Sequence, residues 1–67
     1  MKIILNNREV FIEKERVNVS ELLQIQNFSF RMLIVKINEV VIKKEDYNIT
    51  YINENDYVAV IHLMSGG

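Results

Sequence analysis

One segment near the end of the chain, Tyr57–Leu63 (YVAVIHL), constrains the fold most because it is apolar on both faces of an extended strand. Successive side chains of a strand point to opposite faces, so Val58 and Val60 share one face and the odd-numbered residues share the other. A strand that is apolar on both faces usually lies in the middle of a sheet. The segment therefore predicts a central strand.

The other apolar runs are shorter and are separated by turn residues. Two of them flank Asn6 and Asn7, and asparagine accepts a positive φ better than other non-glycine residues, which predicts a tight hairpin. The expected strands are 2–5 and 9–13 around this turn, then 33–37, which turns at 38–39 into a brief extended piece at 40–42. The polar stretch 43–56 is expected to be irregular, with three anchors in the core: Tyr47, Ile49 and Ile52.

A single short helix is expected over residues 19–26. Asn18 is a favourable N-cap, and Glu21 three residues later gives an approximate capping box. One apolar stripe follows at helical spacing: Val19, Leu22 and Leu23. Because so short a helix is not stable alone, it must pack on the sheet, which predicts an α+β fold in two layers.

One short helix can cover only one face of the sheet. On the other face, Ala59, Ile61 and Leu63 are expected to form an exposed apolar stripe. Scattered apolar residues are also common on an ordinary sheet surface. Three of them on one strand face favour a partner site, so we take Ala59, Ile61 and Leu63 as the candidate docking face.

Composition excludes several classes of function. The chain of 67 residues has no cysteine and a single histidine, and we expect neither catalytic residues nor a metal site. Eight basic and nine acidic residues are spread along the chain, and without a basic stripe we expect no nucleic-acid partner. The longest uninterrupted apolar run, Tyr57–Ile61, is far shorter than the ~20 residues that span a bilayer. We therefore expect a cytoplasmic protein with no membrane partner.

The only two glycines are the last two residues, Gly66 and Gly67, whereas average usage would give about five in a chain of this length. No formally charged side chain occurs from Tyr57 onward. Burying an unpaired charge is costly, and glycine passes where a Cβ would clash, so this ending suits a tail that enters a narrow channel of another protein. The alternative is an ordinary, unconstrained terminus. The residues expected to thread into partner enzymes are Leu63, Met64, Ser65, Gly66 and Gly67.

Four stretches together resemble the ThiS family of ubiquitin-like β-grasp proteins, the bacterial sulfur carriers of thiamine biosynthesis: MKIILNNREV, VSELL, VKINEVVIKKEDY and INENDYVAVIHLMSGG. The resemblance covers essentially the whole chain, and its functionally diagnostic motif is the terminal Gly-Gly. The sequence departs from the family pattern at Asn7, Ile42 and Asn55, all outside the tail. The resemblance implies a mixed sheet of four to five strands with one main helix on one face. It also implies a single domain over residues 1–67, in which 63–67 form a flexible, extended tail.

The same resemblance implies a function. A ThiF-like adenylating enzyme, using ATP with Mg, would activate the carboxylate of Gly67, and a sulfur donor such as a cysteine desulfurase system would convert it to a thiocarboxylate. A ThiG-like thiazole synthase would then take the sulfur. The chain would be a carrier and not an enzyme, with no stably bound cofactor. Three alternatives stay open: the small subunit of molybdopterin synthase, a ubiquitin-like protein modifier, and a plain interaction domain whose tail is incidental.

Overall fold

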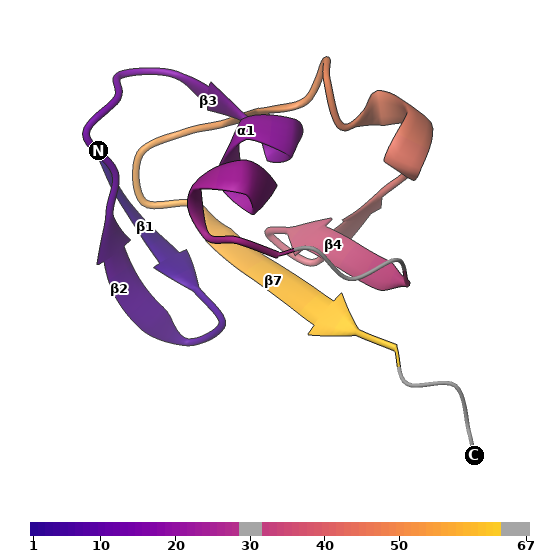
Figure 1. The fold of residues 1–67 in the computed structure, drawn as a ribbon. Coiled ribbons are helices and arrows are strands. Elements are labelled where there is room, and N and C mark those ends of the chain that lie inside the picture. Colours follow the sequence, from indigo (N-terminus) through magenta and orange to yellow (C-terminus); the bar gives the residue numbers. More distant parts are fainter. Residues whose placement is uncertain (29–31, 64–67) are drawn as a thin grey trace.

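The computed structural model of the protein describes residues 1–28 and 32–63, and Figure 1 shows the arrangement of its elements. Their bounds, in chain order, are β1 (Lys2–Leu5), β2 (Arg8–Phe11), β3 (Val17–Asn18), α1 (Val19–Ile25), β4 (Leu33–Ile37), β5 (Val40–Ile42), the 3₁₀ helix η1 (Lys44–Asp46), β6 (Tyr51–Ile52) and β7 (Tyr57–His62). The strands expected at 2–5, 33–37 and 40–42 are confirmed.

The main sheet of the described residues has five strands in the order β2-β1-β7-β4-β5. β7 is therefore the central strand, as its two apolar faces predict. It runs parallel to β1, whereas the other neighbouring pairs are antiparallel, so the sheet is mixed. The N-terminal hairpin and β7, at opposite ends of the sequence, lie side by side (Figure 1).

The hydrophobic core lies between α1 and one face of this sheet (Figure 1). Alternate residues of the strands point into it, which gives the two-layer arrangement that the sequence predicts. Its buried members are Ile3, Leu5, Ile12, Val17, Val19, Leu22, Val35, Ile37, Ile52, Val58 and Val60. Full burial of one such side chain contributes about 1.5–3 kcal/mol, so apolar packing stabilises a chain that has no cysteine to form a disulfide.

A capping box starts α1, as predicted. The side-chain oxygen of Asn18 accepts a hydrogen bond from the Glu21 N–H at 2.8 Å, and Oε1 of Glu21 accepts one from the Asn18 N–H at 3.0 Å. The bond from the Asn18 backbone favours the charged carboxylate and lowers the pKa of Glu21 below its ordinary value, with a smaller contribution from Lys14. The helix ends at Ile25, one residue before the predicted end, because Gln26 serves as its C-cap.

Asparagine occupies tight-turn positions that often hold glycine. Asn6 and Asn7 have φ angles of 51° and 67°, and Asn38 and Glu39 have φ angles of 49° and 72°. Each of these two hairpins therefore turns on two consecutive left-handed residues, the geometry whose twist matches that of paired strands. The turns expected at 6–7 and 38–39 are confirmed, and they explain how the described hairpins form without glycine.

The second and last strands differ slightly from the prediction. β2 spans Arg8–Phe11 instead of 9–13, because the two-residue turn places Arg8 directly opposite Leu5. Ile12 lies just past the strand, and its N–H donates to the Met1 carbonyl at 2.8 Å. β7 ends at His62, one residue before the predicted end.

The stretch 43–56 is more regular than expected. It contains η1 and the short strand β6, which pairs with β3 so that Ile52 lies opposite Val17. Ile52 is buried and Tyr47 packs against the core, where burial raises the pKa of its hydroxyl. The prediction of a third anchor is wrong: Ile49 is 71% exposed. Its N–H donates to the Asp46 carbonyl in the turn that follows η1, and its side chain stays outside the core.

Candidate functional site

The end of β7 carries the residues that the sequence singles out for docking. Ala59 and Ile61 alternate with the buried Val58 and Val60, so they lie on the face of the sheet opposite α1. Ala59 is half-buried, whereas Ile61 is 41% exposed and Leu63, just past the strand, is 39% exposed. We call this side of the sheet the open face.

Neighbouring strands extend the apolar surface around Ala59 and Ile61. Ile34 of β4 lies directly opposite Ile61, and Ile4 of β1 lies beside Tyr57. Residues directly opposite each other in paired strands share a face of the sheet. The open-face patch is defined by the apolar residues that the register brings together: Ile4, Ile34, Val41, Tyr57, Ala59 and Ile61.

Among the residues that the structure describes, one charged side chain, that of Lys36, stands inside the open-face patch. Lys36 of β4 lies opposite Ala59 on one side and opposite Val41 on the other, and it is half-buried there. Away from this point, on the β1–β2 part of the same face, Lys2 pairs with Glu9 at 3.7 Å. Sequence reasoning missed Lys36 because its neighbours come from two other strands, and the register between strands is not visible in one sequence.

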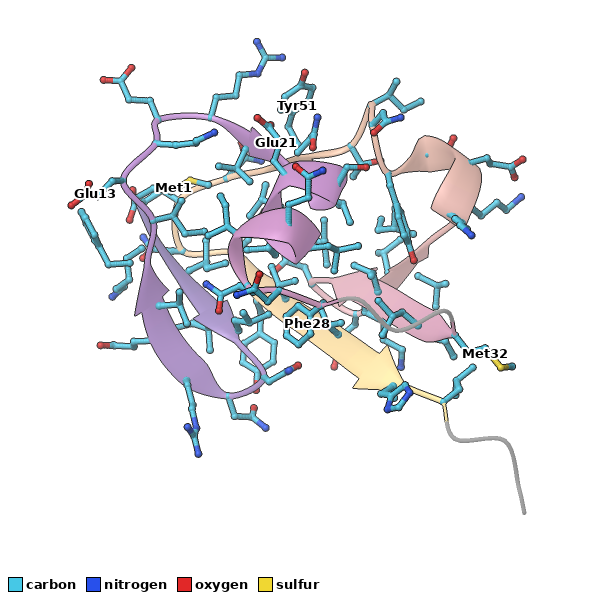
Figure 2. The ribbon with its side chains drawn as sticks, in the orientation of Figure 1. Met1, Glu13, Glu21, Phe28, Met32 and Tyr51 are labelled. Carbon is cyan, nitrogen blue, oxygen red and sulfur yellow. The ribbon has the colours of Figure 1, made fainter. Side chains whose placement is uncertain are left out.

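Two hydrogen bonds hold the second half of β7 and the residue that follows it. The Leu63 N–H donates to the carbonyl of Met32, which Figure 2 shows at this end of the sheet, at 2.9 Å. The Val60 N–H donates to Oδ1 of Asn6 at 2.8 Å, just past the point where β1 ends. Hydrogen bonds therefore hold the chain in place up to Leu63, where it leaves β7 beside the open-face patch. The other predicted tail residues, Met64, Ser65, Gly66 and Gly67, lie outside the described residues.

Neither a metal centre nor a membrane-spanning helix is found in the described residues. Within 1–28 and 32–63, no group of three or more His, Asp or Glu side chains is placed to hold a metal ion. No helix in these ranges has the length and apolarity needed to cross a membrane. The open-face patch combines apolar area with the half-buried side chain of Lys36, which suits contact with the surface of another protein.

In the described part of the chain, a mixed five-stranded sheet has β7 at its centre and the α-helix α1 packed on one face, and this arrangement defines the class of ubiquitin-like β-grasp proteins. Within that class, the model of the ThiS family matches residues 2–67, and the chain therefore belongs to the ThiS family. This finding confirms the fold and the family that the sequence stretches predict.

Two solved structures are similar to the chain. One is the crystal structure of the thiamine biosynthesis protein ThiS from Geobacter metallireducens, with 26% identity, a TM-score of 0.90 and 100% coverage of both chains. The other is an NMR solution structure of a thiamine biosynthesis protein from the same organism, with 26% identity and a TM-score of 0.82. That match covers 100% of this chain and 88% of the other. No curated protein matched the sequence.

Proposed function

We propose that this protein is a sulfur carrier of thiamine biosynthesis, and that its reactive group is the carboxylate of Gly67. The observation that carries the proposal is the ThiS family match, which runs through residue 67 and so includes the Gly-Gly ending. The anchored end of β7 supports it, because the chain enters the tail from a fixed point of the sheet.

The proposed chemistry begins with activation, since a carboxylate is a poor electrophile. An oxygen of the Gly67 carboxylate attacks the α-phosphorus of ATP on an adenylating enzyme, and pyrophosphate leaves. Sulfide, delivered by a sulfur donor, then attacks the acyl carbon and AMP leaves, which produces a thiocarboxylate. Its sulfur is a soft nucleophile that a thiazole-forming synthase can take up. The carrier supplies the acyl group and a docking surface, while ATP and Mg belong to the activating enzyme.

Docking is assigned in this proposal to the open face. Ile61 lies near the end of β7 and Leu63 is the first residue of the predicted tail, and both are exposed apolar residues. A partner that covers them holds the carrier close to the point from which the tail extends. Binding there also removes apolar area from water, which contributes roughly 25 cal/mol per Å² before the costs of association.

The proposal is tested by the intact mass of the protein after incubation with ATP, Mg, the adenylating enzyme of its host and sodium sulfide. The expected result is a gain equal to replacing one oxygen by sulfur, located by fragmentation at Gly67. The matched control carries one alanine after Gly67, which moves the reacting carboxylate while keeping every described residue. This variant is expected to bind the enzyme and to gain no sulfur.

Other outcomes would replace the proposal. Conversion of the alanine-extended variant at the same rate as the wild type would contradict a reaction at the Gly67 carboxylate. Amide linkage of Gly67 to lysines of other proteins in cell extracts would identify a protein modifier. Conversion followed by sulfur transfer only to a molybdopterin-forming enzyme would place the carrier in molybdenum cofactor synthesis. Full function after deletion of Gly67 would leave a plain interaction domain.

A further inference from the structure

Lys36 holds an unusual place on the open face. The register puts Ala59 on one side of it and Val41 on the other, so apolar residues of β7 and β5 flank it within the sheet. The side chain is half-buried, as expected of a lysine whose aliphatic stem covers apolar neighbours while its ammonium group reaches solvent.

The ammonium group of Lys36 has no ion pair among the described residues. The two ion pairs found there join Lys2 to Glu9 and Lys14 to Glu21, at 3.7 and 3.6 Å. A partner that covers the open-face patch must therefore take the Lys36 charge out of water. Burying an ammonium group without a counter-charge is strongly unfavourable, whereas a carboxylate placed against it restores the lost interaction.

We propose that the partner surface which covers the open-face patch is apolar and carries a carboxylate that pairs with the ammonium group of Lys36. This inference rests on the proposed function, because the partner is the adenylating enzyme that activates the tail. Lys36 acts as a specificity-determining residue: it favours an acidic group at the centre of the contact and penalises a purely apolar or basic surface.

A second copy of the chain is a poor occupant of the same face. In a two-fold symmetric contact centred on the open-face patch, the Lys36 of one copy approaches the Lys36 of the other, and like charges repel. The charge of the patch thus favours a partner of complementary sign over self-association.

The test compares binding of three variants to the adenylating enzyme by titration calorimetry. Lys36→Glu reverses the charge and is expected to weaken binding by about tenfold or more, as charge reversal at the centre of an interface does. Lys36→Met keeps most of the stem and is expected to weaken binding less. Lys44→Glu makes the same charge change in η1, which lies on the helix side, where the Tyr47 carbonyl accepts from Ser20 N–H. It is expected to bind like the wild type.

Salt provides a second readout that loss of apolar packing alone would not change. Added salt screens an ion pair, so wild-type affinity is expected to fall with ionic strength more steeply than that of Lys36→Met. Urea unfolding of each variant checks that the fold is kept. Equal binding of Lys36→Glu and the wild type overturns the inference, and so does a wild-type protein that fails to bind the enzyme. A wild type that binds with the expected sensitivity at Lys36 but gains no sulfur overturns the proposed chemistry and supports the docking inference.

Discussion

At the scale of single residues, the non-glycine residues with positive φ in the tight turns lower the stability of the fold. Asn38 and Glu39 form the β4–β5 turn with φ angles of 49° and 72°. Asparagine tolerates this region, but glutamate has no side-chain feature that relieves the contact between its Cβ and the backbone. Sequence reasoning located this turn between the extended pieces 33–37 and 40–42. It could not show that Glu39 itself is left-handed.

Replacing Glu39 by glycine is therefore expected to stabilise the protein. Removing the Cβ relieves a cost of about 1–2 kcal/mol, while the greater freedom of glycine in the unfolded chain takes back roughly 0.4–1 kcal/mol. The difference of the two ranges is about 0–1.6 kcal/mol, so the expected rise in the free energy of unfolding, measured in urea, is about 0.8 kcal/mol. The matched control is Glu45→Gly in η1, where φ is not positive and the same substitution should destabilise. A loss of stability in Glu39→Gly would contradict the assigned turn geometry.

At the scale of elements, the capping box at the start of α1 makes the stability of the fold depend on pH. The pKa of Glu21 is lowered in the folded protein, chiefly because its carboxylate accepts the Asn18 N–H. A group whose folded pKa is depressed stabilises the fold fully above its unfolded value of 4.5, and this contribution is lost as pH falls through the lower folded value. The free energy of unfolding should therefore decrease over this acid range.

Glu21→Gln isolates that contribution. Glutamine keeps an oxygen that can accept the same hydrogen bond but does not titrate, so the variant should lose less stability between neutral pH and acid than the wild type does. Urea titrations at several pH values measure the difference. Glu9→Gln is the matched control, because it removes a carboxylate whose ion pair with Lys2 is exposed. If the free energy of unfolding depends on pH identically in the wild type and in Glu21→Gln, the protonation of Glu21 does not contribute to the loss of stability in acid.

Periodicity decided which elements could be predicted from the sequence. The helix has a capping residue and a stripe at helical spacing, and the hairpins have apolar runs around turn residues, so each is recognisable locally. β3 and β6 have two residues each, Val17 and Asn18 opposite Ile52 and Tyr51, and two residues carry no period. Their pairing depends on a partner more than thirty positions away in the sequence. The same lack of pattern explains why Ile49 was wrongly expected in the core.

At the scale of the whole molecule, the order and register of the strands bring apolar residues of several strands together in the open-face patch. Successive side chains of a strand point to opposite faces, so the sequence alone places Ile61 and Val60 on different faces of β7. This is why the open-face residues of β7 could be predicted. The parallel pairing of β1 with β7, which brings Ile4 beside Tyr57, and the central place of Lys36 require the register of several strands. The candidate site was therefore predicted as a stripe on one strand, whereas the structure presents a patch that crosses four.

The two faces of β7 give opposite expectations for the same substitution in adjacent residues. Ile61→Asp places a carboxylate on the exposed face, so binding to the adenylating enzyme should weaken by about tenfold or more, while the free energy of unfolding changes by about 1 kcal/mol or less. Val60 is only 7% exposed, and Val60→Asp buries a charge in the core, which should unfold the protein. Calorimetric binding and urea unfolding separate these effects. If Ile61→Asp unfolds the chain, the open face contributes to the core; if it binds like the wild type, the partner docks elsewhere.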